Sequence, residues 1–134
     1  MLENLLSKGC VFAGKFKGID HEKYFIITGI TKDVISCCSV FINTDIPRFI
    51  QNNNSLLSLQ VNIQGKKYDF LKHDSFVSCN SIQKYIISDL YKCRYIGKID
   101  DSDLKNILIT IINSDVLSEK ERELYFNDCY SDKV

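Results

Sequence analysis

The sequence has no tryptophan, a single proline and only six glycines among its 134 residues. This scarcity excludes a proline-rich or glycine-rich linker, and the length corresponds to one domain, residues 1–134. No run of about 18 apolar residues occurs, so we expect no membrane-spanning segment. The charged residue Glu3 interrupts the short apolar stretch at the amino terminus, which is not the pattern of a secretory signal.

The chain also lacks net charge, because 17 Lys and Arg residues balance 17 Asp and Glu residues. A protein that coats nucleic acid needs a large basic excess, so that class is excluded. An RNA enzyme with one local basic rim remains compatible with the balance. Lysines concentrate in the first two-thirds of the chain, and acids concentrate between Asp100 and Glu123. We therefore expect a basic groove on the first part and an acidic helical end.

The cysteines form no C-x-x-C pair and no cluster with histidine at zinc-binding spacing. The six are Cys10, Cys37, Cys38, Cys79, Cys93 and Cys129. We expect reduced thiols that pack as small apolar residues, which indicates a cytoplasmic protein. Cys37 and Cys38 are adjacent in an expected strand, so their side chains should point to opposite faces.

Runs of β-branched and aromatic residues predict a sheet before residue 100. The run Tyr24–Thr28 is typical of a strand buried on both faces. The expected strands are Cys10–Lys15, Tyr24–Thr28, Val34–Ile42, Leu56–Ile63, Tyr68–Leu71, Ser75–Cys79 and Tyr95–Ile99. We also expect a short helix over Met1–Lys8 and another that starts near Arg48, after Pro47. The segment Ile82–Leu90 fits either a helix or a mixed structure.

The carboxy-terminal part has the clearest helical pattern. Asp100–Asp103 supplies a cap and acids at a helix start, and apolar residues then recur with helical spacing from Leu104 to Ile112. Ser118 predicts the start of a second helix over Glu119–Phe126. The fold class is therefore α+β: a small, strongly bent antiparallel β-barrel over about residues 9–99, with a C-terminal helical segment over about residues 100–127 across it.

Five segments carry a resemblance to a known family: Gly9–Phe12, Lys23–Ile27, Val40–Thr44, Phe70–Val77 and Tyr95–Ile99. In order and spacing, over about residues 9–115, they resemble the PemK/MazF family of endoribonuclease toxins. The same barrel is shared by the protein toxins of type III toxin–antitoxin systems (ToxN-, CptN- and TenpN-like), whose antitoxin is an RNA. The segment Lys72–Val77 and the lack of basic excess resemble this branch at least as much. Lys23 and Tyr24 stand where the PemK/MazF family has Arg-Pro.

The resemblance implies a metal-independent endoribonuclease toxin that acts in the cytoplasm without a cofactor, of the kind used in phage defence. The ribose 2′-hydroxyl would attack its own phosphate and leave a 2′,3′-cyclic phosphate. The implied partners are the RNA substrate and a cognate antitoxin, with an RNA antitoxin favoured over a small protein, in a homo-oligomer or a toxin–antitoxin hetero-oligomer. Two alternatives stay open: a catalytically inactive barrel that binds RNA or a protein partner, and an unrelated structural domain.

Four residues are candidates for the chemistry. By the resemblance, Lys23 matches the family's arginine and would offset charge on the phosphorane, and Thr44 would donate to a non-bridging oxygen. His73 would move the proton, because imidazole suits proton transfer near neutrality, and Ser75 shares its face in an extended segment. Each has a plainer interpretation: a solvated lysine, a simple turn, an ordinary hydrogen-bonded histidine, or a buried serine that anchors its strand. The other histidine, His21, is interpreted as a loop residue.

Further residues are candidates for RNA binding. Those with cationic or amide side chains are Asn43, Arg48, Lys15, Lys17 and Lys72. Those with aromatic rings, for which core positions are the alternative, are Tyr24, Phe41, Phe49, Tyr68 and Tyr95. We expect no metal ligands.

Overall fold

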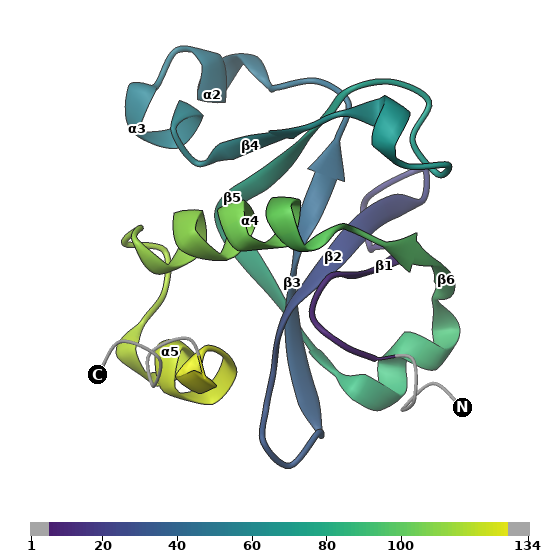
Figure 1. Cartoon of the computed structure of the whole chain (residues 1–134), viewed down its shortest axis with the longest axis vertical. Coiled ribbons are helices and arrows are strands. Elements are labelled where there is room, and N and C mark those ends of the chain that lie inside the picture. Colours follow the sequence, from purple (N-terminus) through teal and green to yellow (C-terminus); the bar gives the residue numbers. More distant parts are fainter. Residues whose placement is uncertain (1–5, 129–134) are drawn as a thin grey trace.

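The computed structural model describes residues 6–128 and contains one sheet with helices packed around it (Figure 1). The strands are β1 (Cys10–Gly14), β2 (Lys23–Ile30), β3 (Ser36–Asn43), β4 (Gln60–Ile63), β5 (Ser75–Ile86) and β6 (Arg94–Lys98). The helices are α2 (Arg48–Gln51), α3 (Asn54–Leu57), α4 (Asp101–Ile112) and α5 (Glu119–Tyr125), with 3₁₀ turns η1 (Gly65–Lys67) and η2 (Ile87–Lys92). Most of the helix expected over Met1–Lys8 lies outside the described residues, and residues 6–8 are not helical.

All strand pairs are antiparallel, in the order β4-β5-β3-β2-β1-β6. The register shifts in three of the pairs, as in β-bulges, which bend and twist a sheet. The α+β class and the antiparallel sheet are confirmed. The expected closure into a barrel was wrong, since no pairing among the described residues joins the edge strands β4 and β6. The four-residue β4 pairs only with the first residues of β5, which leaves little edge for closure.

The central strand β2 is buried on both faces, as predicted. Phe25, Ile26 and Ile27 have no exposed surface. Ile26 belongs to the apolar cluster beneath α4, whereas Phe25 and Ile27 belong to a second cluster on the opposite face. Cys37 and Cys38 of β3 also enter opposite clusters, as their alternation predicted. None of the described cysteines forms a disulfide, and Cys129 lies outside the described residues.

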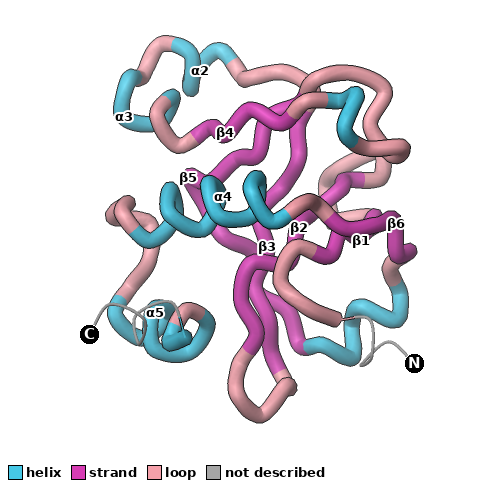
Figure 2. Tube along the Cα trace, in the orientation of Figure 1, coloured by secondary structure: helices cyan, strands magenta, loops and turns pink. Residues whose placement is uncertain are grey.

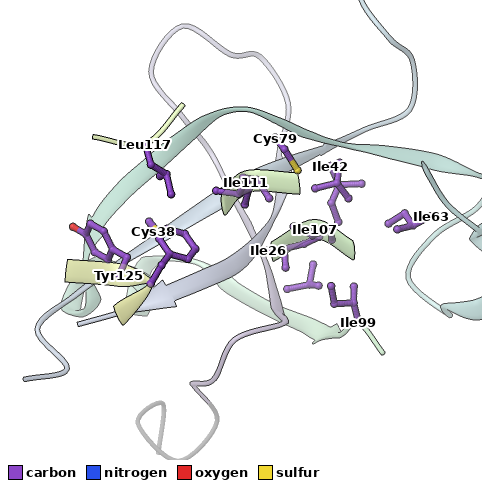
Figure 3. Packing of buried hydrophobic residues seen from close by; sticks show 14 of the residues in the cluster. Ile26, Cys38, Ile42, Ile63, Cys79, Ile99, Ile107, Ile111, Leu117 and Tyr125 are labelled. Carbon is purple, nitrogen blue, oxygen red and sulfur yellow. The ribbon is translucent and has the colours of Figure 1, made fainter. Parts of the chain in front are cut away.

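The two predicted C-terminal helices are present, and α4 crosses one face of the sheet (Figures 1 and 2). The Asp100 side chain caps α4 by accepting the Asp103 N–H at 2.8 Å. The fully buried Ile107 and Ile111 pack among sheet residues such as Ile26 (Figure 3). A capping box at Ser118 begins α5. None of the described helices is both long and apolar enough to cross a membrane.

In the middle of the chain, the strand predicted over Leu56–Ile63 is shorter than expected and the strand predicted over Tyr68–Leu71 is absent. The segment Ile82–Leu90 has the mixed structure that was one of its two alternatives. The Asn53 side chain accepts the Leu56 N–H at 3.2 Å and starts α3, so β4 begins only at Gln60. The segment Tyr68–Leu71 forms turns in place of a strand. The first part of Ile82–Leu90 continues β5, because it pairs with the beginning of β3, and the rest forms η2.

Candidate functional site

A cavity of about 460 Å³ opens at the end of the sheet where β2 begins and β3 ends. Antiparallel pairing of Tyr24 with Ile42 brings these two strand ends together. The segment that leads into β5 also contributes to the lining. The lining residues are His21, Glu22, Lys23, Tyr24, Ile42, Asn43, Thr44, Asp45, Phe70, Leu71, Lys72, His73 and Ser75.

This cavity groups most of the candidates from the sequence. All four catalytic candidates line it, together with Asn43 and Lys72. Arg48 is exposed on α2 and does not line the cavity. Lys15 and Lys17 line a different hollow of about 850 Å³, which shares only Glu22 with the first. The catalytic candidates are therefore gathered at one place, while the RNA-binding candidates are divided between several.

Sequence reasoning missed His21, which lines the same cavity as His73. The chain has only two histidines, and we call this space the histidine cavity. The loop before β2 delivers His21, and the only signal in the sequence was its closeness to Lys23, the first residue of that strand. Two imidazoles at one cavity offer one group to accept a proton and another to donate one.

Lys23 is half-buried and already has partners. Its ammonium donates a hydrogen bond to Asn43 Oδ1 and lies 5.3 Å from the centre of the Phe41 ring. Burial lowers its pKa from the ordinary lysine value. Lys23 and Asn43 occupy adjacent ends of paired strands, so this contact ties β2 to β3 beside Thr44.

A row of polar side chains continues from Asn43 across the sheet. The Asn43 amide donates to Ser78 Oγ at 2.6 Å, and that hydroxyl donates to Gln60 Oε1 at 2.9 Å. Gln60 in turn donates to Asn80 Oδ1 at 3.1 Å. The row links β2, β3, β5 and β4 and fixes the orientation of Asn43. Its signal in the sequence is weak: the polar Ser78 and Asn80 alternate with the apolar Val77 and Cys79, both of which are buried in the structure.

The backbone of His73 is held from two sides, while its side chain is exposed. Ser75 is 2% exposed, and its hydroxyl donates to the His73 carbonyl at 3.1 Å. Asp74 Oδ1 accepts the Gly65 N–H at 2.9 Å, which fastens the segment to η1. β5 begins at Ser75, so the strand alternation expected for residues 72–75 does not apply, and Lys72 and His73 both line the cavity.

The five aromatic candidates have different environments. Tyr68 is buried, and its hydroxyl donates to a carboxylate of α4, so it is a core residue. Tyr24 and Phe41 are half-buried. Phe49 is 66% exposed on α2, and Tyr95 is 41% exposed on β6.

Ion pairs between the helical end and the sheet reduce the expected separation of charge. The Lys67 ammonium lies 2.6 Å from an Asp100 oxygen and 3.2 Å from an Asp103 oxygen. Lys84 pairs with Glu121 at 2.9 Å. Part of the acidic excess near the carboxy terminus therefore faces lysines of the first part of the chain.

No protein-family model matches the chain, and a search of curated proteins finds no match. Within residues 6–128, no three His, Cys, Asp or Glu side chains are grouped so that they could hold a metal ion.

Proposed function

We propose that this chain is a metal-independent endoribonuclease that cleaves RNA at the histidine cavity. One observation carries the proposal: His21 and His73 line the same cavity as Thr44 and the cations Lys23 and Lys72. Cleavage of RNA by its own 2′-hydroxyl needs groups that move protons and groups that stabilise a charged phosphate. The cavity contains both kinds.

In the proposed reaction, the 2′-oxygen forms a bond to phosphorus while the bond from phosphorus to the 5′-oxygen of the next nucleotide breaks. One imidazole accepts the proton of the 2′-hydroxyl, and the other donates a proton to the departing 5′-oxygen. The products are a 2′,3′-cyclic phosphate and a 5′-hydroxyl. The roles of the two histidines are complementary, so the loss of either one removes one of the two assisted proton transfers and slows cleavage.

The remaining residues stabilise and position the phosphate. Thr44 donates to a non-bridging oxygen, and Lys72 offsets the charge that develops there. Lys23 holds Asn43, which precedes Thr44, so in the observed arrangement it positions that turn. Ser75 acts on His73 in the same way, through the backbone carbonyl.

The wider proposal is a cytoplasmic toxin of a toxin–antitoxin system, neutralised by a cognate antitoxin, with an RNA antitoxin favoured. It rests on the resemblance in element order to the PemK/MazF family. The open sheet differs from a closed barrel of that type. If the chain is such a toxin, its expression without an antitoxin should arrest growth.

The direct test incubates the purified protein with labelled single-stranded RNA of mixed sequence in EDTA and identifies the new ends by mass spectrometry. We expect cyclic phosphate and 5′-hydroxyl ends. His21→Ala and His73→Ala should each lower the rate by about 10²–10⁴-fold. Both side chains are exposed, so the melting temperature should not change.

Lys66→Ala is the matched control, because Lys66 is exposed on η1 and does not line the cavity. Full cleavage by both histidine variants would refute the proposed site. RNA binding by a folded wild-type protein that cuts no RNA would favour the inactive RNA-binding alternative.

A further inference from the structure

A second hollow, of about 610 Å³, adjoins the histidine cavity. It lies between residues 67–70 and the edge strand β6, and it is lined by Tyr24, Lys67, Tyr68, Asp69, Phe70, Arg94, Tyr95, Ile96, Gly97 and Lys98. Tyr24 and Phe70 line both spaces, so they form the wall between them. An extended ligand that occupies one of these spaces can continue past this wall into the other.

The shared wall is aromatic. The Tyr24 and Phe70 rings meet at 6.3 Å in an edge-to-face arrangement, and Phe70 also lies 5.2 Å from the buried Tyr68 ring. Phe70 is half-buried, and its ring fits against β6 because position 97 is a glycine. A Cβ atom at Gly97 would lie 3.2 Å from two carbons of the Phe70 ring. Glycine within a strand often marks such a close approach.

A cation stands beside this wall in an ion pair that solvent reaches. Arg94 on β6 lies 2.7 Å from Glu22, with the side chains 60% and 40% exposed. Exposed pairs of this kind contribute little stability, so an incoming phosphate can displace the carboxylate. Glu22 lines the histidine cavity, and Arg94 lines the second hollow. The ion pair therefore bridges the two spaces.

We propose that the second hollow binds the nucleotide next to the scissile phosphate, an inference that rests on the proposed RNA cleavage. The base of an unpaired nucleotide stacks on the wall formed by Phe70 and Tyr24. Its phosphate takes the place of Glu22 on Arg94. Aromatic faces beside cations are the usual arrangement for single-stranded RNA, because every base has a face that can stack.

The exchange of Glu22 for phosphate predicts variant effects of opposite sign. Arg94→Ala removes the cation, so it should weaken RNA binding and reduce the slope of log affinity against log salt by about 0.7, the value for one phosphate contact on a single strand. Glu22→Gln removes the competing carboxylate, so it should strengthen binding. If the ion pair between Arg94 and Glu22 served only to stabilise the fold, both variants would change RNA binding in the same direction.

Binding is measured by fluorescence anisotropy with a fluorescein-labelled, single-stranded 2′-O-methyl oligonucleotide pool of mixed sequence, which cannot be cleaved. Phe70→Leu keeps an apolar side chain but removes the stacking face, so affinity should fall by about five- to 150-fold. Gly97→Ala should also weaken binding by crowding the ring. Tyr91→Leu is the matched control, because Tyr91 is exposed on η2 and lines neither space. Melting temperatures confirm that each variant is folded.

The inference is overturned if Phe70→Leu and Gly97→Ala bind like the wild type, if Arg94→Ala and Glu22→Gln shift affinity in the same direction, or if the folded wild-type protein does not bind the pool at low salt. The binding measurements test the nucleotide site separately from the proposed cleavage of RNA. Predicted binding effects without cleavage of ordinary RNA would support the nucleotide site and refute the nuclease. Cleavage of ordinary RNA, with binding unchanged in the variants, would support the nuclease and refute the nucleotide site.

Discussion

Replacing Gly65 by alanine tests how closely η1 is held against the segment that carries His73. A Cβ atom at Gly65 would lie 2.4 Å from the His73 carbonyl carbon and 2.6 Å from its oxygen. These are backbone atoms, so no side chain can rotate away. The two segments must separate by about 1 Å to restore a contact of 3.4 Å, and the Gly65 N–H bond to Asp74 lengthens with them.

The expected loss of stability follows from two opposing effects. Overpacking of this kind costs about 1–3 kcal/mol. Alanine also restricts the unfolded chain, which returns about 0.4–1 kcal/mol. The middles of these two ranges give a net loss of about 1.3 kcal/mol, which lowers the melting temperature of a chain of this length by about 5 °C. A shift of about 1 Å at a reacting group costs on the order of 100-fold in rate, so cleavage should fall further than stability.

The assays are thermal unfolding and RNA cleavage at a temperature where wild type and variant are both folded. Gln64→Ala is the control, because Gln64 is the exposed neighbour of Gly65 and makes no side-chain cap to η1. If Gly65→Ala melts and cleaves like the wild type, the two segments are not held at the observed distance. A lower melting temperature with unchanged cleavage would show that the position of His73 does not matter for the reaction.

Three further outcomes concern stability and thiol chemistry. Val34 has a left-handed φ of 58° with its side chain 50% exposed, so Val34→Gly should raise the free energy of unfolding by about 0.5–1 kcal/mol in urea titrations. The Lys67 ammonium lowers the pKa of Asp100, so their pairing stabilises the fold above the ordinary carboxyl pKa of 3.8 and is lost as pH falls through the lowered value. The urea midpoint of the wild type should therefore be higher at neutral pH than below about pH 4, and Lys67→Met should make this difference smaller. Burial raises the pKa of Cys38 and Cys79 to about 12, so mass spectrometry should find neither alkylated by iodoacetamide at about pH 8 until the protein is unfolded.

The elements that the sequence predicted well are those decided by local pattern and burial. The Tyr24–Thr28 run became β2, because a strand between two apolar clusters has no polar face to display. The cap at Asp100 and the helical spacing up to Ile112 fixed α4. Local chemistry also explains one error, since capping by Asn53 outweighed the alternation that suggested a strand.

The other differences between the sequence predictions and the structure come from contacts between segments that are distant in the chain. No local pattern of residues indicates such contacts. β5 extends to Ile86 because β3 offers it a second stretch of partner, although the sequence there allows a helix. His21 reaches the histidine cavity because a loop and a segment about 50 residues later meet at one end of the sheet. The lysines and acids that are separate in sequence meet as ion pairs, such as Lys84 with Glu121.

The pairing of β1 with β6 has a consequence for the order of folding. The loop between β2 and β3 has about five residues, whereas about 80 residues separate β1 from β6. Closing the longer loop costs about 2.5 kcal/mol more in chain entropy. The β2–β3 hairpin therefore forms early and β6 docks late. Since Arg94 and Gly97 lie on β6, we expect the second hollow to form only after β6 has docked on β1.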